Sequence, residues 1–301
     1  MLSGAMLVWF LLTGASLALL LFDLVTNSPV SWVQKLAWFL VVCYTGPVGL
    51  IAYLYACRRP FAGGHDAATS TWWKQGINSE VHCLAGDATG IIIAASIVPA
   101  LALGNGWDIV IEYLSGFVCG LFIFQALMMI SMFDGNYFTA VRKTFFAEAV
   151  SMNFVMAGMI PTMVLLAAAW PASMEPTQWA FWFRMSLASI VGGVLAFPIN
   201  AWLVQRKLKH GCMTLPGADD GPPPQMGHAT SETSRVMEPE GHDMGHHESA
   251  GHDMADMEHG EHEGHQMASI SLAAQTGWVF GTLALVILAT FVTHNFAPIS
   301  F

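Results

Sequence analysis

Long runs of apolar residues, separated by short polar segments, dominate the pattern of this chain. Seven runs reach the length of about 20 apolar residues that a bilayer-crossing helix needs; they cover roughly 4–25, 34–57, 81–103, 109–132, 147–170, 178–204 and 273–295. The first run lacks a positively charged start, so we interpret it as a retained helix rather than a cleaved signal peptide. The pattern predicts an all-α, polytopic transmembrane bundle of about seven spans.

The composition supports a lipid environment. Hydrophobic residues make up 54% of the 301 residues and charged residues only 11%, whereas soluble domains carry about 25% charged residues. Of the 21 acidic residues, 12 lie between Asp219 and Glu263, where Arg235 is the sole base. The net charge of −10 therefore describes one segment, and no basic surface indicates a nucleic-acid partner.

These patterns divide the chain into four parts. We expect two N-terminal transmembrane helices in 1–58 and a four-helix transmembrane core in 75–210. Residues 211–268 form an acidic segment rich in Pro, Gly, His and Met, which has too few apolar residues to fold alone and is expected to be disordered. A last transmembrane helix follows at 273–295.

Basic residues predict the orientation, because cytoplasmic loops are enriched in Lys and Arg. With seven spans, one side collects most of the bases: Arg58, Arg59, Lys74, Arg142, Lys143, Arg206, Lys207 and Lys209. Lys35 lies alone on the other side. This count predicts a bacterial inner-membrane protein with its N-terminus and its His/Met-rich segment in the cytoplasm and its C-terminus outside.

The His/Met-rich segment carries a metal-ligand composition. The sequence Gly-His-Asp-Met occurs at 241–244 and again at 251–254. The candidate ligands are His228, His242, Met244, His246, His247, His252, Met254, Met257, His259, His262, His265 and Met267. Imidazole suits copper, zinc and nickel, whereas thioethers select Cu(I). The mixture therefore favours copper, as Cu(I) or Cu(II), with zinc or nickel as alternatives. The alternative to metal binding is a purely solvating linker.

Ionisable residues inside the predicted spans are costly and often functional. At 100° per residue, Glu80, Cys83 and Asp87 share one arc of a helix, with His82 on another face. They predict a metal entry site, or otherwise a polar contact between helices. In the next span, Asp108, Glu112, Ser115 and Cys119 share one face. This stripe predicts a polar path that leads to a thiol, with Glu112 and Cys119 as candidate metal ligands, or otherwise acidic residues at the membrane interface.

A methionine stripe follows in the fifth predicted span. Glu148, Met152, Met156, Met159 and Met163 lie within about 80° on a helical wheel. Thioethers three or four residues apart offer successive weak sites for a soft ion, although such stripes are more often flexible core packing.

Three sequence blocks resemble one known family. They are Glu80 to Asp87, the run from Ala147 to Met152 with Gly158-Met159, and Phe197 to Val204 followed by Lys209-His210-Gly211-Cys212-Met213. Over roughly 75–215 the chain resembles the bacterial membrane family known as domain of unknown function 4396. The resemblance implies a helical membrane domain and an association with copper and heavy-metal handling, without a defined reaction.

Two functions follow as expectations. The first is an integral membrane protein that binds a transition metal, with copper favoured over zinc or nickel, and acts in transport or delivery of that metal. The second is a membrane scaffold whose His/Met-rich segment buffers or senses metal for a partner cuproenzyme. The expected protein partners are a membrane-bound cuproenzyme or a metallochaperone. An enzyme is not expected, because only His82 lies well inside a span and His294 lies at the edge of one.

Overall fold

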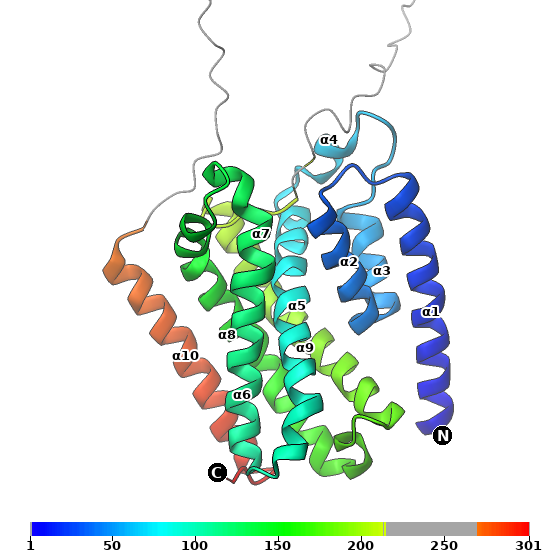
Figure 1. The fold of residues 1–301 in the computed structure, drawn as a ribbon, viewed down its shortest axis with the longest axis vertical. Helices are drawn as coiled ribbons and strands as arrows, with labels where there is room; N and C mark the ends of the chain where they lie inside the picture. Colours follow the sequence, from blue (N-terminus) through cyan, green and yellow to red (C-terminus); the bar gives the residue numbers. More distant parts are fainter. Residues whose placement is uncertain (1, 213, 215–269, 301) are drawn as a thin grey trace, which may run out of the picture.

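The computed structural model describes residues 2–212, 214 and 270–300 (Figure 1). The metal ligands predicted in the His/Met-rich segment, from His228 to Met267, lie outside the described residues. The α-helices are α1 (Leu2–Thr26), α2 (Trp32–Thr45), α3 (Pro47–Ala56), α4 (His65–Thr69), α5 (Trp72–Ile97), α6 (Asn105–Val118), α7 (Ala126–Met129), α8 (Tyr137–Ala169), α9 (Trp179–Gln205) and α10 (Leu272–His294). Short 3-10 turns occur at Val98–Leu101, Ile130–Phe133 and Pro171–Met174, and a π-helical stretch at Cys119–Gln125 joins α6 to α7.

The all-α membrane bundle predicted from the sequence is confirmed. Within the described part of the chain, six helical segments are long and apolar enough to cross a bilayer: Ser3–Thr26, Trp72–Leu101, Asn105–Phe133, Tyr137–Ala169, Trp179–Gln205 and Leu272–His294. The four central segments carry the family-like sequence blocks and pack closely together. α1 and α10 lie at opposite margins of the bundle (Figure 1) and present mostly apolar surface outward.

The second predicted span, 34–57, is not one helix. It folds into α2 and α3, which run back along each other as a hairpin. The rings of Trp38 and Tyr53 lie 5.3 Å apart, although a continuous helix would separate them by about 22 Å. At the open end of the hairpin, Asn78 of α5 contacts both Gln34 of α2 (3.4 Å) and the carbonyl of Ala56 (2.8 Å). α2 and α3 therefore enter and leave at the same end of the bundle.

The hairpin turns at Gly46, directly before Pro47. The backbone of Gly46 has φ +57°, and a Cβ there would lie 2.5 Å from the Thr13 hydroxyl of α1. Proline cannot continue the ladder of α2 but is well suited to the first turn of α3. The residue pair thus permits both the reversal and the close approach of α1.

The hairpin changes the predicted topology. With six crossings, both chain ends lie at one end of the bundle (Figure 1). Thr214 and Ile270, which flank the His/Met-rich segment, lie at the opposite end, because Thr214 contacts His65 and α10 starts beside α9. The prediction that the N-terminus and that segment share one side was therefore wrong. The error comes from counting the hairpin as one crossing.

Candidate functional site

A cluster of buried polar side chains lies in the middle of the bundle. We call it the central polar cluster; it consists of Glu80, Cys83, Asp87, Glu148, Ser151, Asn200 and Lys209, all at most 6% exposed. The thiol of Cys83 on α5 donates a hydrogen bond to Glu148 Oε2 on α8 (2.9 Å). Ser151 donates to the Asn200 side-chain oxygen on α9 (2.8 Å). Four of the sequence-predicted residues, Glu80, Cys83, Asp87 and Glu148, are thus brought together.

The cation at the centre of this cluster is Lys209. Its Nζ lies 2.5 Å from Cys83 Sγ, 2.7 Å from Asn200 Oδ1 and 3.9 Å from Glu148 Oε2. α9 ends at Gln205, and Lys207 adopts φ +55°, so the chain turns back and inserts the next basic side chain into the bundle. The sequence pattern assigned Lys209 to a cytoplasmic loop, so this role was missed.

Two carboxylates of the cluster point at a single place. A Cβ built on Gly120, in the π-helical stretch, would lie 2.2 Å from Asp87 Oδ1 and 2.5 Å from Glu148 Oε1. Both of these oxygens, and Asp87 Oδ2 as well, are buried without a hydrogen-bond partner. Glycine at 120 is therefore required for α5 and α8 to bring the two acids together.

Glu80 and His82 take different roles at the rim of the cluster. Glu80 Oε2 accepts a hydrogen bond from the Asn200 side-chain amide, which links it to the cluster. His82 lies on another face, as the helical wheel predicts, and its Nε2 contacts the Gln34 side-chain oxygen of the hairpin. His82 therefore anchors α2 and does not join the carboxylates.

The remaining membrane candidates are not gathered at one site. Glu112 lies towards the opposite end, where it lines a cavity of about 300 Å³ with Asp108, Met163 and Arg184. Cys119 is half-buried and begins the π-helical stretch. Met152, Met156, Met159 and Met163 are all buried in the hydrophobic core. The methionine stripe is therefore part of the packed core, and its role as a series of soft-ion sites stays a prediction.

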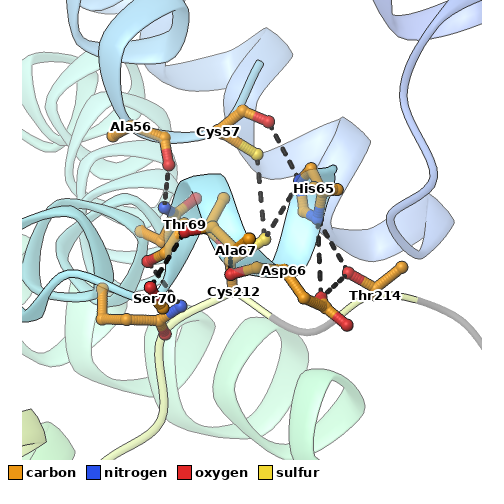
Figure 2. Close-up of polar contacts among 11 residues, drawn as sticks. Ala56, Cys57, His65, Asp66, Ala67, Thr69, Ser70, Cys212 and Thr214 are labelled. Carbon is orange, nitrogen blue, oxygen red and sulfur yellow. Dashed lines mark hydrogen bonds and ion pairs between the residues drawn. The ribbon is translucent and has the colours of Figure 1, made fainter. Parts of the chain in front are cut away.

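A second cluster lies at the end of the bundle where the His/Met-rich segment begins. Cys57 ends α3, His65 begins α4 and Cys212 follows α9 (Figure 2). Their ligand atoms all lie within 4.8 Å of one another. The two sulfurs are 3.8 Å apart, and His65 Nε2 lies 3.9 Å from Cys212 Sγ. Cys212 is only 9% exposed and the other two are more deeply buried.

The geometry of this Cys/His cluster fits a transition metal. Two Zn–S bonds of about 2.3 Å at a tetrahedral angle place the sulfurs about 3.8 Å apart, which is the observed separation. Two thiolates and one imidazole also form a donor set for Cu(I). To bind a metal, His65 Nε2 would leave its present partner, the Cys57 carbonyl oxygen at 3.0 Å.

A second layer of contacts orients the histidine. His65 Nδ1 lies 2.7 Å from the Thr214 hydroxyl, and that hydroxyl donates to the Asp66 carboxylate (Figure 2). A hydrogen bond on one ring nitrogen fixes the imidazole and frees the other nitrogen for a metal, as in many metal sites. Thr214 is held in place by a backbone bridge to Val30.

The two thiols have unequal acidities. Burial raises the pKa of Cys57, but the hydrogen bonds with Cys212 and His65 outweigh it and lower this pKa to about 6. The hydrogen bond with Cys57 and then burial raise the pKa of Cys212 well above its ordinary value. Burial lowers the pKa of His65, but its contacts with Cys57 raise it above the ordinary value overall. One thiolate is thus available near neutral pH.

Comparison with known proteins finds a similarity for the central part of the chain. Residues 72–209 match the model of the family described as domain of unknown function DUF4396. The chain resembles this family. The match contains Glu80 to Asp87, Glu148 and Lys209, and it excludes Cys57, His65 and Cys212. No curated protein and no solved structure matches the chain significantly. The central polar cluster therefore lies in the family-like core, and the Cys/His cluster lies on its flanks.

Proposed function

We propose that this chain is an integral membrane protein that binds a transition metal, copper above zinc or nickel, and acts in metal transport or delivery. The observation that carries the proposal is the Cys/His cluster of Cys57, His65 and Cys212. Its donors are soft, its sulfur separation suits a metal, and it lies next to the start of the His/Met-rich segment. A ligand-rich segment could capture ions and pass them to this buried set, a binding role rather than catalysis.

The distribution of bases supports a cytoplasmic position for this end of the bundle. With the hairpin folded back, the described bases gather at the same end: Lys35, Arg58, Arg59, Lys74, Arg142, Lys143, Arg206 and Lys207. Lys35, which a seven-span topology placed on the opposite side, now lies at the same end as the other bases. The described residues of the other end hold only Arg184, which is buried. We propose a cell-membrane protein with the His/Met-rich segment inside and both termini outside.

Delivery to a partner is the second candidate, and Lys209 favours it. A path for Cu(I) through the core would begin at Cys83, but the Lys209 ammonium already contacts that sulfur. The Cys/His cluster lies at the end of the bundle proposed to be cytoplasmic, and Lys209 occupies the first sulfur of such a path. A protein of this kind would bind metal at the Cys/His cluster and hand it to a membrane-bound cuproenzyme or a metallochaperone.

Metal stoichiometry and affinity test the proposal. The full-length protein is purified in detergent, titrated with Cu(I) and separately with Zn(II) against a chelating competitor, and analysed by plasma mass spectrometry. We expect one tightly bound ion, lost in the Cys57→Ser and Cys212→Ser variants. Cys43→Ser, which removes a thiol outside the cluster, is the matched control. Equal tight binding by all four proteins would refute the assignment.

Transport and delivery are separated by vesicle assays. Vesicles containing the protein are loaded with a Cu(I) indicator and exposed to Cu(I). Uptake that requires Cys57 would support transport. Binding without uptake, followed by transfer to an added thiol-containing acceptor, would support delivery.

A further inference from the structure

The central polar cluster contains more buried acid than base. Glu80, Asp87 and Glu148 supply three carboxyl groups, and Lys209 supplies one ammonium. An uncompensated charge inside a membrane domain is costly, because no water is present to solvate it. If all three acids were ionised, Lys209 would balance one of them, and two negative charges would remain. The cluster must therefore hold additional positive charge.

The contacts locate where that charge is missing. Glu80 accepts from the Asn200 amide and, at 6% exposure, lies at the rim of the cluster. Glu148 Oε2 faces the Cys83 thiol and the Lys209 ammonium. The Asp87 and Glu148 carboxyl groups face each other, and both oxygens of Asp87 and the second oxygen of Glu148 have no other hydrogen-bond partner, although both side chains are fully buried. Glu80 Oε1 also lacks a partner. Of the two uncompensated charges, one therefore belongs to Glu80 at the rim, and the other is shared between Asp87 and Glu148.

The surroundings of this pair contain no other cation among the described residues. The titratable groups that face it are Glu80 and Cys83 on α5, Tyr113 on α6, Cys119 at the start of the π-helical stretch, and Lys209 after α9. Apart from Lys209, each is neutral or negative. Nothing else near the pair can supply the missing positive charge.

We propose that Asp87 and Glu148 together bind one exchangeable monovalent cation, a proton or a sodium ion, in the middle of the membrane domain. The two convergent carboxylate oxygens, Asp87 Oδ1 and Glu148 Oε1, are hard ligands, which suit either ion and do not select Cu(I). Gly120 lies in a π-helical stretch, a feature frequent at functional sites, and its missing side chain leaves the space where the oxygens meet. The site does not depend on metal at the Cys/His cluster; its use as a coupling ion rests on the proposed function.

Infrared spectroscopy tests the site directly. Full-length protein in detergent and sodium-free buffer is titrated around neutral pH while the carbonyl band of protonated carboxylic acids is recorded. We expect this band at pH 7, reduced in Asp87→Asn and in Glu148→Gln. Asp23→Asn is the control, because Asp23 is ion-paired with Arg58 (3.0 Å) and lies outside the central polar cluster. Loss of the band on adding sodium at constant pH assigns the site to both ions, and an unchanged band assigns it to the proton.

Two results would overturn the site. One is a wild-type protein without a protonated-acid band in sodium-free buffer at pH 7, which needs no variant to fold. The other is a band that Asp87→Asn and Glu148→Gln both leave intact. Metal stoichiometry measured on the same samples should remain at the wild-type value, so failure of this site and failure of the Cys/His cluster are distinguishable.

Discussion

The ammonium of Lys209 lies 2.5 Å from the sulfur of Cys83, although 126 positions separate the two residues. The contact joins the end of α9 to the middle of α5 and places a permanent positive charge among buried carboxylates. It explains how a family-like core with three buried acids can be stable. It also gives the core a cation before any ion is bound.

Removing this charge should destabilise the protein. Lys209→Met leaves Glu148 and its neighbours without their ammonium, and breaking a buried ion pair costs about 3–5 kcal/mol. We expect a clearly lower midpoint of thermal unfolding in detergent. Lys207→Met, which changes an exposed lysine two residues away, is the control. A Lys209→Met midpoint equal to that of wild type would contradict the central role of this contact.

The tip of the α2–α3 hairpin should tolerate only glycine. Gly46→Ala forces a side chain into φ +57° and places a Cβ 2.5 Å from the Thr13 hydroxyl. The backbone conformation of Gly46, with ψ −133°, is outside the left-handed helical region, and a side chain there costs about 1–3 kcal/mol; the contact adds to this cost. Gly277→Ala on α10, where a Cβ meets nothing within 4 Å, should be neutral or slightly stabilising. Thermal unfolding of both variants checks the difference, and equal midpoints would speak against a tight hairpin tip.

The metal-free Cys/His cluster should release its two thiol protons in well-separated steps. Because the Cys57 pKa is lowered to about 6, one thiolate forms as the pH rises through 6, while Cys212 stays protonated well above the ordinary thiol range. The ultraviolet absorbance of thiolates measures this. In Cys212→Ala the hydrogen bond to the Cys57 sulfur is lost, so the first step should move to higher pH. An unmoved step would show that Cys212 does not lower the Cys57 pKa, and Cys43→Ser should leave it in place.

Both chain ends should lie on the same side of the membrane. Single cysteines introduced at Ser3 and Ser300, in a background without the native thiols, test this with a membrane-impermeant reagent on intact cells. We expect both to be labelled, since six crossings separate them. A cysteine at Ser70, between α4 and α5, should be protected. Opposite behaviour of Ser3 and Ser300 would restore a seven-span topology.

The helices and part of the central polar cluster could be predicted from the sequence, because both follow from local spacing. Cys83 and Asp87 lie on one arc of a helix, and hydropathy alone delimits α8, which carries Glu148. The hairpin could not be predicted from hydropathy, because a run that folds back on itself is as apolar as one that crosses. The signal available was Gly46-Pro47, a pair typical of a helix break.

The Cys/His cluster could not be predicted from the spacing of residues along the sequence. Cys57 and Cys212 lie 155 positions apart and come together only through the packing of α3 and the end of α9. Neither belongs to a Cys-x-x-Cys pair, so the usual metal-site spacing gave no indication. Lys209 was missed for a different reason: a base just after a long apolar run is typical of a cytoplasmic anchor, and only the turn at Lys207 directs it inward.

Three peptide bonds connect Lys209 to Cys212. One short segment therefore carries both the ammonium of the central polar cluster and a sulfur of the Cys/His cluster. Linkage between two sites is reciprocal: if occupancy of one site changes the affinity of the other by some factor, occupancy of the second changes the affinity of the first by the same factor. If a metal ion at the Cys/His cluster shifts Cys212 and with it Lys209, then ionisation of the central polar cluster would change the affinity for that metal, while the number of bound ions stays the same.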